Sequence, residues 1–129
     1  MRFILDTNII SAIIKGHPAV FVHFEAHRSD EIYLCQPVYF ETMRGLIWKR
    51  ADSKIGLLER LRSQLGWLQL NDHHWTQAGR FWADSVSHGR QLSDVDLLIA
   101  ALAFDLDAII VSNDSDFDAL SVQRENWLA

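Results

Sequence analysis

Short apolar runs alternate with helical patterns along the whole chain, and this alternation limits the possible folds more than any other feature. The runs predict strands because each is brief, rich in branched or aromatic residues, and ends at polar or turn-forming residues. The predicted strands are Arg2–Leu5, Ile32–Cys35, Trp67–Leu70, Ala108–Val111 and a short strand at Ser121–Gln123.

Apolar residues at helical spacing fill the segments between these strands. The predicted helices are Thr7–Lys15, a helix from Pro18 to about Arg28, Val38–Lys49, Ser53–Leu65, a long helix from Asn71 or Asp72 to about Ser87, and a helix capped by Ser93 that runs through Phe104. Phe40, Met43 and Ile47 form one apolar stripe on the third of them. Strands that alternate with helices predict an α/β fold, a parallel sheet with helices on both faces and right-handed crossovers.

Length and composition favour one soluble domain. The chain has 129 residues, of which 49% are hydrophobic and 22% charged, as in ordinary globular proteins. Its apolar runs are too short for a membrane span, and the first residues lack the order of a signal peptide, so we expect a cytoplasmic protein. Cys35 is the only cysteine, and its apolar surroundings predict a buried thiol.

Charge is segregated along the sequence. The net charge of −5 argues at first against nucleic acid, because binding to phosphates depends on basic side chains. Residues 91–123, however, hold seven aspartates and no lysine or arginine, whereas residues 44–62 hold six basic residues and two acidic ones. The basic segment can meet phosphates, or it can be an ordinary solvated helix surface.

Carboxylates follow the predicted strands at the edge where parallel sheets place their functional sites. Asp6 ends the first strand, Asp114 lies three residues after the fourth, and Glu41 lies one turn into the helix after the second. Asp94 and Asp96 occupy the first turn of the helix that Ser93 caps. Each aspartate alone can be a helix cap or turn former, but their joint placement predicts an acidic cluster.

A cluster of carboxylates requires a cation, because neighbouring negative charges raise one another's pKa. Oxygen ligands without histidine or cysteine favour Mg²⁺ or Mn²⁺ over zinc. A metal held in this way suits phosphodiester hydrolysis. The adjacent His73 and His74 are interpreted as an exposed helix start, since no further ligands for a transition metal can be identified near them in the sequence.

Five motifs in order resemble the PIN-domain family and, within it, the VapC-type toxins of toxin–antitoxin pairs. They are Leu5-Asp6-Thr7-Asn8; Glu41 with Gly45; the segment from Leu92 to Ala101; Val111-Ser112-Asn113-Asp114-Ser115-Asp116-Phe117; and Glu125-Asn126-Trp127. They span nearly the full length. The resemblance implies a PIN-like three-layer α/β/α sandwich with a central parallel sheet of four to five strands.

The resemblance also implies an Mg²⁺- or Mn²⁺-dependent endoribonuclease acting on transfer RNA or another structured RNA. Its metal-binding catalytic residues would be Asp6, Glu41, Asp96 and Asp114. Supporting residues would be Asp94, Asp116, Thr7, Asn8, Ser112 and Asn113, with Asp116 ranked below Asp114. The basic residues Arg44, Lys49, Arg50 and Lys54 can contact RNA, the antitoxin or neither.

Two partners follow from the same resemblance: a second copy of the chain in a homodimer, and a VapB-type antitoxin that covers the acidic groove. The alternative is a PIN-like domain that binds RNA or a protein without cutting. The presence of all four carboxylates argues against that alternative.

Overall fold

The computed structural model describes all of residues 1–129. Five strands form one sheet in the order β3-β2-β1-β4-β5, and every neighbouring pair is parallel. The strands are β1 (Arg2–Leu5), β2 (Glu31–Cys35), β3 (Gly66–Leu68), β4 (Ile109–Val111) and β5 (Gln123–Glu125). The predicted parallel sheet is confirmed, with five strands.

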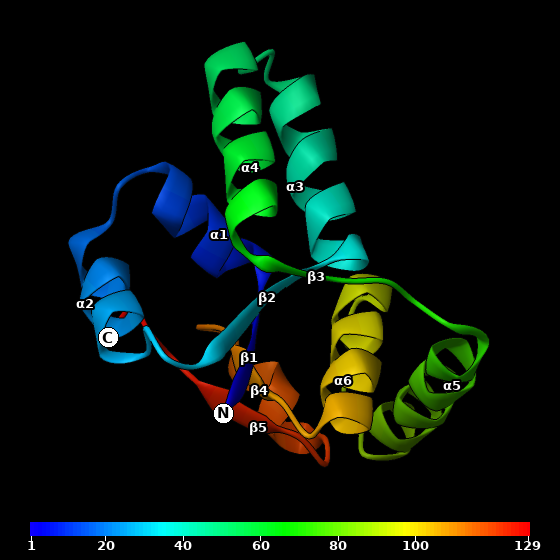
Figure 1. Cartoon of the computed structure of the whole chain (residues 1–129). Helices are drawn as coiled ribbons and strands as arrows, with labels where there is room; N and C mark the ends of the chain where they lie inside the picture. The colour runs from blue at the N-terminus through cyan, green and yellow to red at the C-terminus, as the bar shows by residue number, and fades with distance from the viewer.

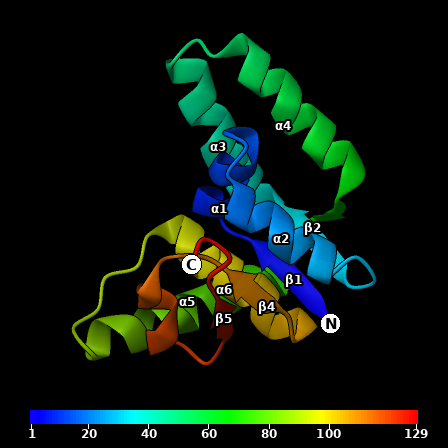
Figure 2. The same cartoon turned by 90° about the vertical axis from the view of Figure 1, so that its left-hand side faces the viewer.

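Six helices complete a three-layer α/β/α arrangement. They are α1 (Thr7–Ile14), α2 (Pro18–Ala26), α3 (Gln36–Trp48), α4 (Asp52–Gln64), α5 (Asp72–Ser87) and α6 (Asp94–Leu106), with a 3-10 helix, η1, at Ser115–Ala119. In Figure 1, α1 and α2 lie on one side of the sheet and α5 and α6 on the other. Figures 1 and 2 both show α3 and α4 projecting together beyond the sheet.

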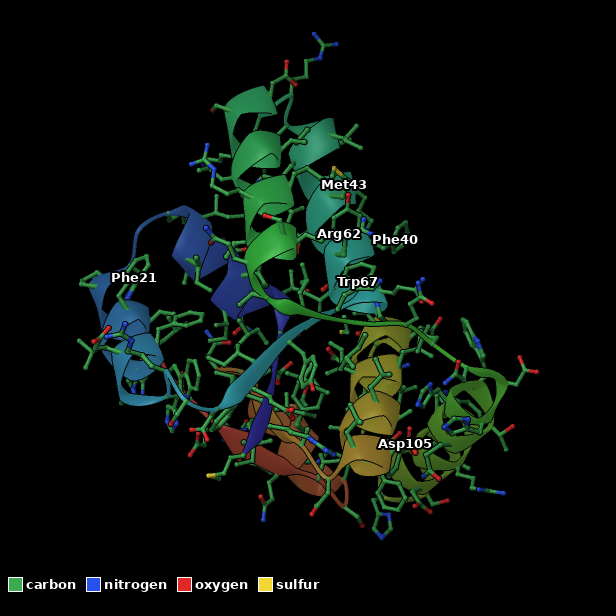
Figure 3. The ribbon with its side chains drawn as sticks, in the orientation of Figure 1. Phe21, Phe40, Met43, Arg62, Trp67 and Asp105 are labelled. Atoms are coloured by element: carbon green, nitrogen blue, oxygen red, sulfur yellow. The ribbon has the colours of Figure 1, made fainter.

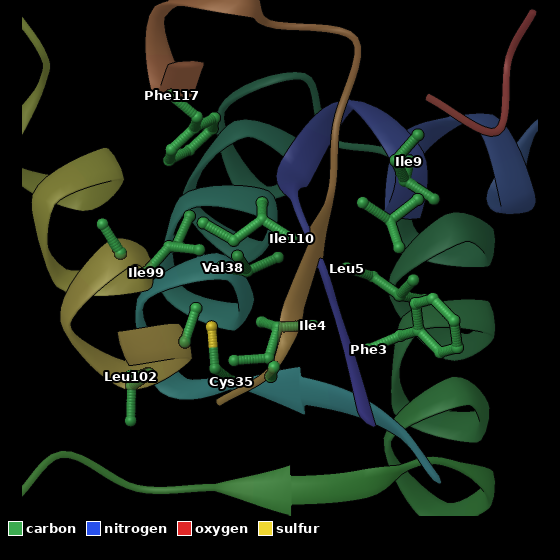
Figure 4. Packing of buried hydrophobic residues seen from close by; sticks show 14 of the residues in the cluster. Phe3, Ile4, Leu5, Ile9, Cys35, Val38, Ile99, Leu102, Ile110 and Phe117 are labelled. Atoms are coloured by element: carbon green, nitrogen blue, oxygen red, sulfur yellow. The ribbon is translucent and has the colours of Figure 1, made fainter. Parts of the chain in front are cut away.

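The central strand β1 packs against both helical layers because successive side chains point to opposite faces of a strand. Figure 4 shows Phe3 and Leu5 on one side of β1 and Ile4 on the other, the side where Cys35 and Leu102 lie. All three β1 side chains are fully buried. Since this strand has apolar neighbours on both faces, it reads in the sequence as a continuous apolar run.

Cys35 is buried, as predicted, and forms no disulfide. Burial raises the pKa of its thiol to about 12. No helix has the length and apolar content needed to cross a membrane.

The last strand lies two residues later than predicted, at Gln123–Glu125 instead of Ser121–Gln123. Arg124 explains the register, because its guanidinium donates to both carboxylate oxygens of Asp118 and to the backbone oxygen of Ser112. Contacts outside the strand itself therefore place a polar segment in the sheet.

The apolar stripe on α3 is largely exposed, and of its three residues only Met43 packs against the core. Phe40 and Ile47 are 57% and 60% exposed, and Trp48 is 85% exposed. Figure 3 shows Phe40 and Met43 on the part of α3 that projects from the sheet. A stripe of this kind looks the same in sequence whether it is buried or exposed.

Candidate active site

Asp6 lies where β1 ends and α1 begins, and its side chain is held from three directions. It caps α1, with Oδ1 accepting the Thr7 backbone amide at 2.8 Å. Its Oδ2 accepts bonds from the Ser112 hydroxyl at 2.6 Å and the Asn8 amide at 3.0 Å. Burial raises the pKa of Asp6, which the bonds from Ser112 and Thr7 partly offset, while the charges of Glu41 and Asp114 raise it further.

Ser112 links the loop after β4 to the end of β1. Besides donating to Asp6, its fully buried hydroxyl accepts bonds from the Asn8 side chain at 3.2 Å and the Asp114 backbone amide at 3.0 Å. Asn8 in turn accepts the backbone amide of Asn113 at 3.2 Å. Asn8 and Ser112 therefore bond directly to Asp6, whereas Asn113 contributes its backbone amide to Asn8.

Glu41 reaches the site from α3, where its side chain is 27% exposed. The Thr7 hydroxyl donates to Glu41 Oε1 at 2.5 Å. Arg44, one turn further along α3, places its guanidinium 3.5 Å from Glu41 Oε2 and lies over the Phe40 ring at 5.0 Å. Thr7 therefore positions Glu41, and Arg44 partly balances its charge.

Asp96 lies in the first turn of α6, where the Ser93 hydroxyl accepts its backbone amide at 3.1 Å. Its pKa is raised to about 6, first by burial and then by the negative charges of Asp6, Asp114 and Glu41, while a bond with Ser93 opposes the rise. None of the nine ion pairs in the structure involves Asp96. The four predicted carboxylates therefore act on one another electrostatically, as a shared site requires.

The two other acidic candidates, Asp94 and Asp116, lie apart from these four. Asp114, one of the four, caps η1 by accepting the backbone amide of Asp116 at 2.9 Å. The Asp116 carboxylate itself faces Arg90 at 3.6 Å. Asp94 lines a different pocket, between α5 and α6, with Trp75 and Trp82. Thr7 and Asn8 both contact the cluster.

The donor set of the cluster fits a hard divalent cation. Four carboxylates and no histidine or cysteine gather at one edge of the sheet. Burial first, and then the neighbouring negative charges, raise the pKa of both Asp6 and Asp96. A cation would relieve this repulsion. Asp6, Glu41, Asp96 and Asp114 are the residues that would hold it.

His73 and His74 form a separate cluster with Asp105 of α6. The predicted exposure is wrong for His74, which is only 3% exposed. Three ligand-type atoms of the cluster lie within 4.8 Å of one another. His74 Nδ1 accepts the Asn71 backbone amide at 2.8 Å, so the proton of the neutral ring lies on Nε2, 2.9 Å from Asp105. The Nε2 proton bonds to Asp105, which Figure 3 labels, and so links α5 to α6. Because a protonated nitrogen has no free lone pair for a metal, the cluster is a poor metal site.

The predicted basic residues have different surroundings. Lys49 and Lys54 line a pocket beside Glu41, and Arg50 is an exposed residue with positive φ between α3 and α4. Lys15 lines the same pocket and was not among the sequence candidates. The spacing of Thr7, Ser11 and Lys15 by four residues, which places them on one side of a helix, is the signal that could have identified it.

Comparison with known proteins assigns the chain to a family. The PIN domain family profile matches residues 3–123, and the chain belongs to that family. Ribonuclease VapC1 of Haemophilus influenzae is 26% identical over 133 residues, with 98% of each chain covered. Ribonuclease VapC19 of Mycobacterium tuberculosis is 29% identical over 111 residues, with 84% of this chain and 86% of the relative covered.

A solved structure shows the same fold. A chain in the crystal structure of VapBC2 from Rickettsia felis, bound to a DNA fragment from their promoter, superposes with a TM-score of 0.89 at 24% identity, covering 98% of this chain and 99% of that chain. Almost the whole chain is aligned, so the fold is shared along its length.

Proposed function

We propose that this protein is a divalent-metal-dependent endoribonuclease. The observation that carries the proposal is the proximity of Asp6, Glu41, Asp96 and Asp114: burial, followed by the charges of the other three carboxylates, raises the pKa of Asp96 to about 6. The family and the ribonuclease relatives support the reaction class. Hydrolysis of an RNA phosphodiester, in transfer RNA or another structured RNA, is the reaction that such a site suits.

Mg²⁺ or Mn²⁺ bound by the four carboxylates would supply an activated water and neutralise charge on the phosphate. The chain's own contribution is to hold the ligands in place. Asp6 has little freedom, because Ser112, Asn8 and the Thr7 amide fix both of its oxygens. Glu41 is oriented by Thr7 in the same way. Such fixed ligands reduce the cost of forming the metal site.

The cell must restrain a nuclease of this kind, and the relatives suggest how. The Rickettsia felis structure is of a VapBC assembly. By analogy we propose that a VapB-type antitoxin binds this protein over the acidic groove and that the protein forms a homodimer. Measurement of molar mass by light scattering, with and without the antitoxin, tests both parts.

The activity is tested by incubating purified protein with a total transfer-RNA pool and a ribosomal RNA preparation, each with Mg²⁺, Mn²⁺ or EDTA. Discrete fragments that require the metal and disappear with EDTA are expected. Absence of fragments from both RNA preparations under every metal, in protein shown to be free of antitoxin by mass spectrometry, would favour a binding domain that does not cut.

A further inference from the structure

A cavity of about 210 Å³ lies next to the acidic cluster, between α1, α3 and the start of α4. It shares Thr7 and Glu41 with the cluster. Thr7, Ser11 and Lys15 line it from α1, and Glu41, Gly45 and Lys49 from α3, in each case at intervals of four residues. Because this spacing keeps side chains on one side of a helix, each helix leads from the acidic cluster to a lysine.

The charge of this cavity is unusual for the chain. Lys15, Lys49 and Lys54 all line it, and they are the only lysines in the sequence. All three are exposed, and none forms an ion pair, although nine ion pairs involve other basic groups. Lys15 and Lys49 also cap the C-terminal ends of α1 and α3, where a positive charge is favourable. That local effect does not account for the convergence of all three on one cavity.

The remaining lining consists of one hydroxyl, that of Thr42, and the aliphatic side chains of Ile14, Leu46 and Ala51. Thr42 lines the cavity, is 6% exposed, and its hydroxyl has no hydrogen-bond partner in the chain. Buried hydroxyls without partners are uncommon, and such a group can serve a ligand. No aromatic side chain lines the cavity, so it lacks the stacking platform that a nucleobase site uses. Lysines and hydroxyls without aromatic rings suit a phosphate group.

We propose that this cavity, the lysine pocket of Lys15, Lys49 and Lys54, holds one phosphodiester of the RNA strand beside the bond that the acidic cluster cuts. The proposal rests on the proposed nuclease function, since it assigns the substrate's second contact. Positive charge on one side and carboxylates on the other would orient the strand. The pocket thereby separates Lys49 and Lys54, as RNA contacts, from Arg44 and Arg50.

Binding of a labelled single-stranded RNA, measured by anisotropy across a range of salt concentrations in an Asp96→Asn background, tests the pocket without relying on cleavage. Replacing the three lysines by glutamine should raise Kd on the order of tenfold at low salt and lower the log–log salt slope by about 0.7, the value for one phosphate on a single strand. A charge-matched control replaces Arg28, Arg60 and Arg80, three exposed arginines outside the pocket, and should leave the slope closer to that of the parent.

Two results would overturn the proposal. An unchanged slope in the lysine variant would mean that the pocket does not contact the backbone, and a loss of about 2 would mean three separate phosphates. Failure of the nuclease proposal looks different, because it appears as absent cleavage by the wild-type protein and leaves the binding measurement intact.

A second pair of variants separates the cavity from diffuse positive charge. A Cβ at Gly45 or at Gly56 would meet nothing within 4 Å, but only Gly45 lines the pocket. Gly45→Met should therefore fill the pocket and weaken RNA binding without changing charge, while Gly56→Met on α4 should not. Since methionine is a better helix former than glycine, neither change should unfold the protein. Equal binding by the two variants would contradict an enclosed phosphate site.

Inorganic phosphate distinguishes a free anion from the RNA backbone as the ligand. Amide chemical shifts of Thr42 and Gly45 are followed while phosphate or RNA is added at constant ionic strength. RNA should shift both amides at concentrations where inorganic phosphate has little effect. Shifts with phosphate alone, together with unchanged RNA binding by the lysine variant, would assign the pocket to a free anion and overturn the proposal.

Discussion

The Ser112 hydroxyl lies 2.6 Å from Asp6 Oδ2 and joins the ends of β4 and β1, two strands separated by more than a hundred residues in sequence. The bond fixes the most deeply buried carboxylate of the acidic cluster and lowers its pKa against the effect of burial. Ser112 is therefore a positioning residue in this account, and its replacement should affect metal binding more than folding.

Ser112→Ala should weaken Mg²⁺ or Mn²⁺ binding about 10- to 100-fold, the usual effect of losing a partner of a metal ligand. Isothermal titration with Mn²⁺ measures the affinity. The control is Ser85→Ala, because Ser85 is equally buried but bonds to the backbone oxygen of Trp82 in α5. Similar metal affinities for the two variants would show that Ser112 does not organise the site.

Asp96→Asn should stabilise the metal-free protein at neutral pH. The folded pKa of Asp96, about 6, exceeds its ordinary value of 3.8, so the protonated form adds stability that is complete below pH 3.8 and is lost as the pH rises through 6. A fully buried group with this difference would account for roughly 3 kcal/mol. Because Asp96 is partly exposed, solvent screening reduces the expected effect to about 1 kcal/mol.

Urea unfolding of the wild type and Asp96→Asn at several pH values, in EDTA, measures this difference. The variant should be the more stable protein above pH 6 and should match the wild type near pH 3.5. Saturating Mg²⁺ should remove the advantage at neutral pH. An Asn variant that is less stable at every pH would contradict the account of repulsion among the carboxylates.

Cys35 should resist alkylation in the folded protein. Its thiol is fully buried and its pKa is about 12, so the reactive thiolate is nearly absent at neutral pH. Modification by iodoacetamide, followed by mass spectrometry, should track global unfolding as urea is increased. Fast alkylation without urea would mean that β2 opens far more easily than its position between β3 and β1 suggests.

His74→Ala should destabilise the protein by about 1–3 kcal/mol, because it removes a buried ring that bonds to Asn71 and Asp105. His73→Ala, on the exposed partner of the same cluster, is the control and should cost much less. Neither change should alter metal-dependent cleavage. Tight Zn²⁺ or Ni²⁺ binding that is lost in His74→Ala would reverse this interpretation and make the cluster a metal site.

The sequence was most informative where a local pattern decides the structure. The strand Arg2–Leu5, the cap at Ser93 and the positions of Asp6 and Asp96 follow from apolar runs and helix N-terminal preferences, which act over a few residues. The supporting roles of Asn8 and Ser112 came instead from the family resemblance, and the hydrogen bonds of both side chains to Asp6 are present.

Contacts between distant segments account for what the sequence left unpredicted. β5 is set by Arg124 and its bonds to Asp118 and Ser112, and His74 is buried only because Asp105 of α6 lies beside it. The lysine pocket likewise combines α1, α3 and α4. Pairing of this kind depends on how helices pack, which spacing along one helix does not reveal.

The most direct test of the central claim compares RNA cleavage by the wild type, Asp6→Asn and Asp107→Asn in Mg²⁺, Mn²⁺ and EDTA. Asp107 ends α6 in a left-handed conformation that asparagine also accepts, so the second variant is a matched Asp-to-Asn control outside the acidic cluster. We predict metal-dependent fragments from the wild type and Asp107→Asn and none from Asp6→Asn, with all three folded by circular dichroism. Full cleavage by Asp6→Asn, or cleavage that persists in EDTA, would contradict the assignment of the acidic cluster as the nuclease centre.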